Sequence, residues 1–314
     1  MNARVDYDEF GYFHENAAEY GLAYGRPPLV RRESVHVAHG RTVSALVWGD
    51  AAAEMVLIHG GAQNAHTWDT VALALRRPLV AVDLPGHGHS DAASSEPKGL
   101  SAPERHARDM AVVVDGLAPG ARAVVGMSLG GLTSIALAGQ APELVRSLVL
   151  VDITPGVTGA KAKEILDFVN GPARFASFEE MLARTIEFNP TRTESSLRRG
   201  ILHNALQLDD GSWIWRYRRH DAGMPSELVR DAGAEAGREQ PIVPTHLWDT
   251  LGAVQVPVML VRGMREQSVV DDADEAELRR RLPGARIEHV AEAGHSVQGD
   301  APVQLAALLD DFIP

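Results

Sequence analysis

The stretch from Val124 to Ala138, VVGMSLGGLTSIALA, places one serine between two different patterns. Before it lies a short apolar run without alternation, which is typical of a strand buried on both faces. After it, small and apolar residues follow with helical spacing. Gly126 and Gly130 flank Ser128 as G-x-S-x-G, so the chain has room for a strained strand-to-helix turn that presents the hydroxyl. Ser128 is a candidate nucleophile, and the alternative is a capping serine in a glycine-rich turn.

Short apolar runs of the same kind recur along the chain, at residues 55–61, 78–91, 121–128, 145–156 and 256–264. Residues 34–50 add a predicted hairpin around His39 and Gly40. Helical patterns separate the runs, at residues 101–120, 129–142 and 271–284. The first opens with a possible capping box, Ser101 with Glu104. This alternation predicts an α/β fold, with a mostly parallel sheet and helices on both faces.

The strand–helix alternation is interrupted once, between residues 157 and 252. This segment has a helical pattern and an aromatic cluster with Trp213, Trp215 and Tyr217. We interpret it as an inserted helical cap over the core. The predicted organisation is an N-terminal extension at 1–31, a core at 32–156 and 253–314, and a cap at 157–252.

Composition excludes several classes of function. The net charge of −12 disfavours binding to nucleic acid or to an anionic membrane surface. The absence of cysteine excludes disulfides and thiolate chemistry. The first residues form no secretory signal, and no apolar run approaches a membrane span, so a cytoplasmic protein is expected. The oligomeric state stays open.

A nucleophilic serine needs a base and donors for an oxyanion. Of 13 histidines, His295 is placed best, because it follows a strand-like run in a glycine-flanked loop before the last helix. The turn at 59–61 is rich in glycine, and the amides of Gly61 and Leu129 are the expected oxyanion donors. A phosphate-binding loop is disfavoured, since the chain has no G-x-G-x-x-G or P-loop lysine there.

These motifs together resemble the α/β-hydrolase superfamily over about residues 32–155 and 255–312. The resemblance rests on HGG at 59–61, DLPGHGHSD at 83–91, GMSLGG at 126–131 and AGHS at 293–296. It implies chemistry without a cofactor or a metal. The turn with His87 and His89 is structural in this family, and no metal site is expected there.

The triad acid has two candidate positions. Many members of the family carry it after the strand that follows the cap, where this chain offers Glu266. Others carry it after the strand that follows the nucleophile helix, where Asp152 lies. Asp152 is favoured, although a turn aspartate at a strand end is also common.

The resemblance implies a serine hydrolase that cleaves a carboxylic ester or lactone of a mostly apolar small molecule through an acyl-enzyme. Trp213 and Trp215 either line the substrate pocket or pack the cap onto the core. A carbon–carbon bond hydrolase of the same superfamily is the alternative, although Met127 stands where those enzymes often have asparagine. A slow ligand receptor is a further alternative.

Overall fold

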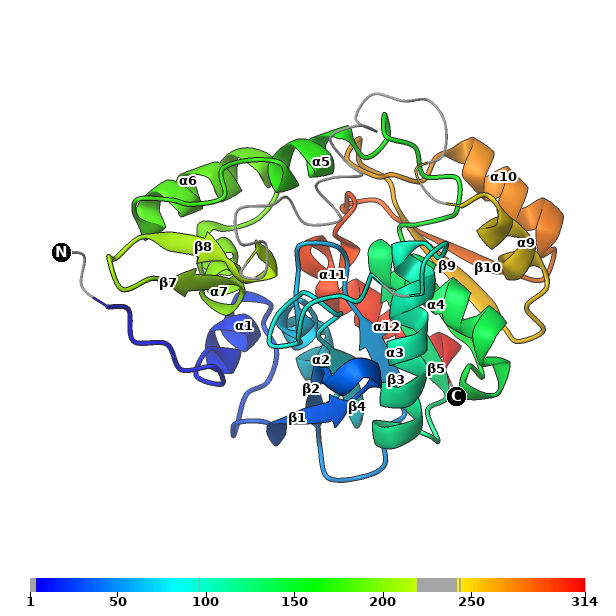
Figure 1. Cartoon of the computed structure of the whole chain (residues 1–314), viewed down its shortest axis with the longest axis horizontal. Helices are drawn as coiled ribbons and strands as arrows, with labels where there is room; N and C mark the ends of the chain where they lie inside the picture. The colour runs from blue at the N-terminus through cyan, green and yellow to red at the C-terminus, as the bar shows by residue number, and fades with distance from the viewer. Residues whose placement is uncertain (1–3, 96, 219–241, 243, 314) are drawn as a thin grey trace.

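An eight-stranded sheet forms the centre of the molecule (Figure 1). The computed structural model describes residues 4–95, 97–218, 242 and 244–313. The strands, in the order β1-β2-β4-β3-β5-β6-β9-β10, are β1 (Val30–His36), β2 (Thr42–Trp48), β4 (Leu79–Val82), β3 (Met55–Ile58), β5 (Ala123–Met127), β6 (Leu148–Val151), β9 (Val258–Gly263) and β10 (Arg286–Val290). β2 pairs antiparallel with β1 and β4, and the remaining pairs are parallel. The predicted fold class is confirmed.

The central strands are apolar along their whole length because both faces of the sheet are covered. In β5, Val124 packs into the core on one face and Val125 into the core on the other. Leu148 and Val149 of β6 divide in the same way. Successive side chains of a strand point to opposite faces, so two buried faces require a run without alternation.

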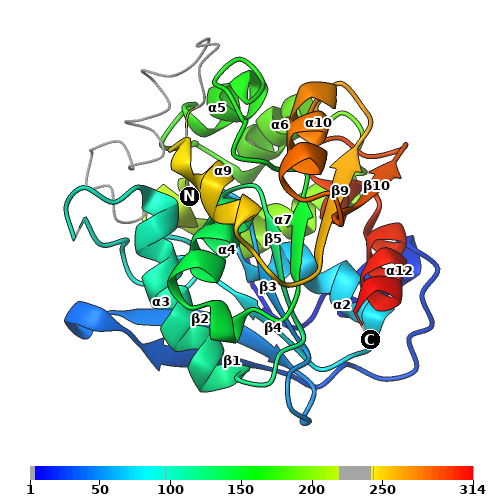
Figure 2. The same ribbon diagram turned by 90° about the vertical axis from the view of Figure 1, so that its right-hand side faces the viewer.

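Helices cover both faces of the sheet (Figure 2). One layer holds α3 (Ala102–Leu117), α4 (Leu129–Gln140), α9 (His246–Gly252) and α10 (Asp272–Arg281), and the other holds α2 (Asp69–Leu75) and α12 (Pro302–Phe312). The predicted capping box of Ser101 and Glu104 opens α3. The short helix α11 (Val297–Asp300) precedes α12. None of the described helices combines the length and the apolar character needed to cross a bilayer.

The inserted segment forms a separate layer above the carboxyl ends of the parallel strands (Figure 1). It contains α5 (Lys163–Val169), α6 (Phe178–Phe188), α7 (Glu194–Asn204), β7 (Ala205–Gln207) and β8 (Trp213–Trp215). The last two pair as an antiparallel hairpin, which the sequence prediction of a helical cap did not include. Strands of three residues are too short to show a two-residue period in the sequence. The one sequence signal for this hairpin was Gly211, which occupies the turn with φ 85°.

The predicted N-terminal extension carries one helix, α1 (Phe13–Glu19), and contacts both core and cap. Phe13 is 2% exposed and packs against Trp48 of β2 with ring centroids 4.9 Å apart. On the cap side, Arg199 of α7 donates a hydrogen bond of 2.7 Å to Asn16 and pairs with Glu19. The segment therefore fastens the cap to the core.

Candidate active site

Ser128 lies in a sharp turn between β5 and α4. Its backbone has φ 52° and ψ −121°, a conformation that costs a non-glycine residue about 1–3 kcal/mol. The flanking glycines are required by close contacts. A Cβ on Gly126 would lie 2.4 Å from the carbonyl oxygen of Gly130, and one on Gly130 would lie 2.2 Å from that of Ile58. The steric reason for the motif is thus present in the structure.

Asp152 and His295 are joined by a hydrogen bond. Asp152 directly follows β6, is fully buried, and its Oδ2 lies 2.9 Å from Nδ1 of His295. The same oxygen accepts from the amide of Val269, whereas Oδ1 accepts from the amide of Gly263 and the hydroxyl of Ser268. These three donors come from β9 and the loop after it. They fix the carboxylate beside the imidazole.

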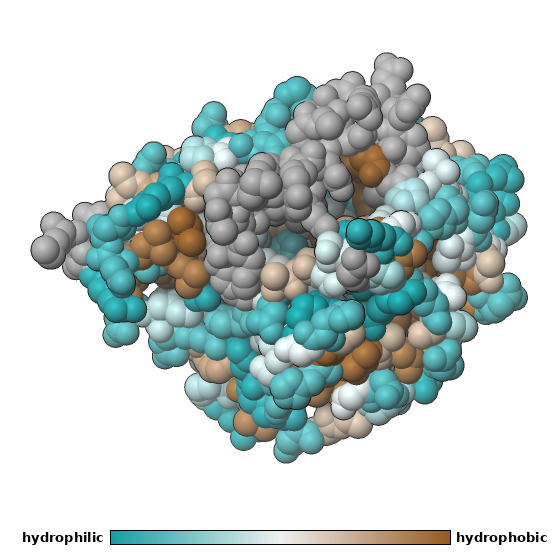
Figure 3. Space-filling model, viewed as in Figure 1, coloured by the Kyte–Doolittle hydropathy of each residue, from teal (hydrophilic) through white to brown (hydrophobic). Residues whose placement is uncertain are grey.

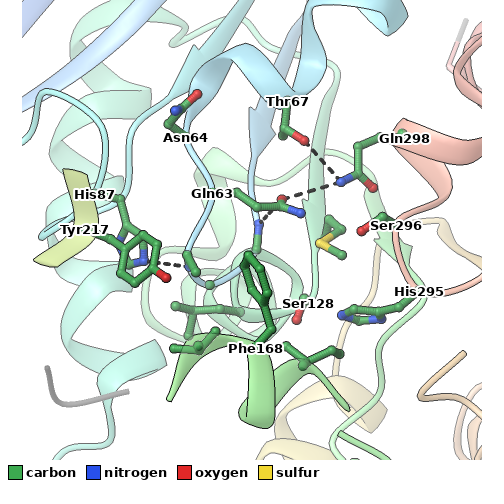
Figure 4. A pocket seen from close by; sticks show the side chains of 18 of the residues that line it. Gln63, Asn64, Thr67, His87, Ser128, Phe168, Tyr217, His295, Ser296 and Gln298 are labelled. Carbon is green, nitrogen blue, oxygen red and sulfur yellow. Dashed lines mark hydrogen bonds between the residues drawn. The ribbon is translucent and has the colours of Figure 1, made fainter. Parts of the chain in front are cut away.

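The second ring nitrogen of His295 is directed toward a pocket of about 1210 Å³. This Nε2 atom is buried and has no hydrogen-bond partner among the described residues. Ser128 lines the same pocket, and Figure 4 shows its hydroxyl facing the imidazole. The face in Figure 3 is largely hydrophilic, with a hollow near its middle. The arrangement leaves an unpaired imidazole nitrogen beside a serine hydroxyl.

Gly61 and Leu129 line the same pocket as Ser128. Within the described ranges, no group accepts a hydrogen bond from the amide of Gly61 or of Leu129. The neighbouring amides are occupied, since Gly60 donates to Oε1 of Gln63 and Ala62 donates to a histidine. A Cβ on Gly60 would lie 3.1 Å from that of Ser128, so this turn borders the serine closely.

His87 and Asn204 hold the glycine turn from two sides, a role that the sequence analysis missed. Nε2 of His87 accepts from the amide of Ala62 at 3.1 Å, and Nδ1 lies 3.1 Å from the carbonyl of Pro85. Burial and the neighbouring His59 lower the pKa of His87 to about 3, so it stays neutral and can accept. Asn204, at the end of α7, donates to the carbonyl of Ala62 at 2.7 Å. The cap thus contacts the turn directly.

Polar side chains continue from this turn toward the helix after His295 (Figure 4). Gln298 of α11 donates to Thr67 at 3.2 Å and to Gln63 at 3.4 Å. Gln63 in turn accepts from the amide of Gly60. One wall of the pocket is therefore a hydrogen-bonded chain. The sequence did not predict this chain, because its three side chains are two ordinary amides and a hydroxyl, and Gln298 lies far from the other two along the sequence.

Of the remaining predicted residues, Glu266 and Trp215 lie at the pocket and Trp213 does not. Glu266 is exposed, lies on the pocket rim, and accepts only from Gln267 among the described residues. Trp215 lines the pocket and stacks on Tyr217. Trp213 is absent from the described pocket lining and packs in the centre of the cap against Phe178. The structure brings Asp152, rather than Glu266, to His295.

Comparisons with known proteins agree with this architecture. A family model described as the alpha/beta hydrolase fold matches residues 55–302. The esterase Rv0045c of Mycobacterium tuberculosis is 42% identical over 309 residues, which cover 96% of this chain and 94% of that protein. A structure of the same esterase, from work on its transition metal inhibition, is 40% identical. It has a TM-score of 0.79 and covers 98% of this chain and 99% of that one.

A 3-hydroxybutyrate-oligomer hydrolase of Cupriavidus necator is 29% identical over 82% of this chain and 88% of its own length. The esterase matches nearly the whole chain, with both the N-terminal segment and the cap included. By these matches, the chain belongs to the α/β-hydrolase family and is an ester hydrolase.

Proposed function

We propose that the chain is a serine hydrolase that cleaves a carboxylic ester or lactone of a mostly apolar small molecule through an acyl-enzyme. The observation that carries the proposal is the relation of three side chains. Ser128 occupies a strained turn at the pocket, and His295 presents an unpaired Nε2 there while Asp152 holds its Nδ1 at 2.9 Å.

Acylation follows from this relation. Oγ of Ser128 attacks the substrate carbonyl carbon, and Nε2 of His295 takes the hydroxyl proton. The amides of Gly61 and Leu129 donate to the oxyanion, and each such donor contributes roughly 3 kcal/mol in related acyl-transfer sites. The intermediate collapses as His295 returns the proton to the leaving oxygen, and the alcohol departs. Asp152 stabilises the imidazolium during both steps.

Deacylation reverses the same roles with water. Nε2 of His295 takes a proton from water, whose oxygen attacks the ester carbonyl of the acylated Ser128. When the second tetrahedral intermediate collapses, the proton returns to Oγ and the acid is released. For a lactone, the leaving oxygen stays attached to the acyl chain, so the product is a hydroxy acid.

The pocket lining supports a mostly apolar substrate. Apolar side chains from the core and the cap face the cavity, among them Leu132, Ile153, Val157, Phe168 and Trp215. A cavity of about 1210 Å³ is somewhat larger than most small-molecule sites, which measure about 300–1,000 Å³. The polar wall at Gln63 and Gln298 can accept one hydrogen-bonding end of the substrate.

Partitioning between water and methanol tests the acyl-enzyme. Esters of one acid with different alcohols pass through the same acylated Ser128, so the ratio of free acid to methyl ester should not depend on the leaving group. Ser128→Ala is the matched control, and a fluorophosphonate should label the wild-type peptide that contains Ser128. A ratio that changes with the leaving group, or labelling of another residue, would contradict the proposal.

A further inference from the structure

Three buried side chains meet where the core, the cap and the N-terminal segment join. His66 lies in the 3₁₀ turn η2 (Ala65–Trp68), Asp69 begins α2, and His203 lies near the end of α7. One ligand atom of each lies within 4.8 Å of those of the other two, and their exposures are 7%, 2% and 4%. We propose that this cluster binds a divalent transition metal ion of the zinc type, a site that the sequence analysis did not predict.

The donor atoms are spaced for a tetrahedral ion. Nδ1 of His66 lies 2.9 Å from Oδ2 of Asp69, and Nε2 of His203 lies 3.9 Å from the same oxygen. Bonds of 2.0–2.1 Å at tetrahedral angles separate ligand atoms by roughly 3.3 Å, and the two observed distances bracket this value. Two imidazoles and one carboxylate leave the fourth position to water from the pocket, which all three residues line.

Two polar atoms of the cluster lack the partners that burial normally requires. Neither Nε2 of His203 nor Oδ1 of Asp69 makes a hydrogen bond to any of the described residues. Unpaired polar atoms are costly at this depth, because they have given up water without a replacement. A metal ion bound to Nε2 of His203 would satisfy that nitrogen, and Oδ1 of Asp69 would then be free to accept from the metal-bound water.

In each histidine, the ring nitrogen that would not bind the ion already makes the kind of contact that orients a metal ligand. Nε2 of His66 lies 3.1 Å from the carboxylate of Glu9, and Nδ1 of His203 lies 2.7 Å from the hydroxyl of Tyr7. Ligating histidines usually donate their second N–H to an oxygen in this way, which fixes the ring and raises its basicity. Both partners belong to the N-terminal segment.

Binding requires small rearrangements. The two rings stack with centroids 3.8 Å apart and planes at 11°, so at least one must turn about its broad χ2 torsion before both nitrogens point at one ion. The hydrogen bond of that ring to Glu9 or Tyr7 must adjust with it. Burial lowers the pKa of His66, but Asp69 and Glu9 outweigh it and raise the pKa to about 9. The ion therefore displaces a proton from His66.

The charges around the cluster are mixed. Glu9 and Asp69 are the nearby carboxylates, and both favour a cation. Arg32, Arg199 and Arg216 act on the same histidines and oppose one. Arg32 is already paired with Glu9 and with the buried Asp83. Arg199 is paired with Glu19 of α1, so much of the positive charge of both arginines is compensated.

Zinc titration of the metal-free, full-length protein tests the site by calorimetry and by thermal melting. We expect one ion per chain and, at saturation, a melting temperature at least about 3 °C higher, because the ion binds only the folded chain. Cobalt(II) should give the intense visible bands of a tetrahedral complex. If the cobalt(II) complex of the wild type showed only the weak bands of octahedral coordination, the proposed tetrahedral ligand set would be wrong.

Variants locate the ion. His203→Gln and the nearly isosteric Asp69→Asn should each weaken binding at least about a hundredfold, and Tyr7→Phe about tenfold, since outer partners contribute less. His289→Gln, at an exposed histidine paired with Glu275, is the control and should bind zinc as the wild type does. Zinc binding that survives both ligand variants, or that is lost only in His295→Gln, would overturn the proposal.

Discussion

Replacing Asp152 by asparagine removes the charge next to His295 while almost keeping the shape. The carboxylate accepts four hydrogen bonds, two at each oxygen. At Oδ2, an amide nitrogen would face the Val269 N–H and the imidazole. At Oδ1 it would face the Gly263 N–H and the hydroxyl of Ser268, which already contacts the carbonyl of Val270 at 3.1 Å and can donate there instead.

The amide nitrogen is therefore expected at the Oδ1 position, so that its carbonyl still faces His295. One buried N–H, that of Gly263, then loses its acceptor. Such a loss lowers the free energy of unfolding by about 1–3 kcal/mol. The positive φ of 47° at this position does not add to the cost, because asparagine tolerates it well.

The loss of catalysis follows from the missing charge. A carboxylate and an imidazolium whose charges lie about 4 Å apart attract by about 4 kcal/mol at an effective dielectric constant of 20. Since about 1.4 kcal/mol corresponds to a factor of ten, kcat/KM of Asp152→Asn should fall about 10³-fold. This is less than the ~10⁴ expected when the wrong tautomer is enforced.

The assay is initial-rate hydrolysis of a nitrophenyl ester, with urea unfolding of the same samples. Glu266→Gln is the matched control, and it should stay within about threefold of the wild type because Glu266 is exposed. A folded Asp152→Asn enzyme that kept more than about a tenth of the wild-type kcat/KM would refute the reasoning. A large loss in Glu266→Gln would move the acid to the loop after β9.

Three further predictions concern the turn and the cap. Ser128→Ala should lower kcat at least about a thousandfold with the fold intact, measured by ester turnover and circular dichroism. Gly130→Ala should unfold at clearly lower denaturant concentration than wild type, because its Cβ meets backbone oxygen. Gly200→Ala, in α7 with open space around it, should be neutral or slightly stabilising. Trp215→Ala should change relative kcat/KM among esters of different size, since Trp215 lines the pocket. Trp213→Ala should leave the relative kcat/KM values unchanged, although both variants should lower the melting temperature because both side chains are buried in the cap. Equal substrate profiles for the two variants would contradict this distinction.

The sheet and the serine turn could be predicted because their signals are local. Runs such as residues 148–151 are apolar because both faces are covered, and Gly126 and Gly130 are required by close backbone contacts around the serine turn. The position of Asp152 at a strand end was also readable. The sequence favoured Asp152 over Glu266 but left both open, because the choice depends on how the loops after β6, β9 and β10 meet in space.

Other features were beyond a single sequence because their partners are distant. His87 and Asn204 both bind the backbone of Ala62, from 25 and 142 residues away. Either residue alone is an ordinary polar side chain in a loop or at a helix end. The hairpin of β7 and β8 was missed because three-residue strands carry no measurable period, and tertiary contacts in the cap decide their conformation.

The N-terminal segment has a consequence for how molecules enter the enzyme. Swinging the cap away as a rigid lid would break the contacts of Arg199 with Asn16 and Glu19, because the N-terminal segment is itself held to the core by the hydrogen bond from Tyr20 to the carbonyl of Gly299 in α11. Substrates must then pass with the cap in place, so the width of the opening acts as a sieve. Rates across a series of esters should fall abruptly beyond a certain cross-section, and cutting the chain after α1 should soften that limit.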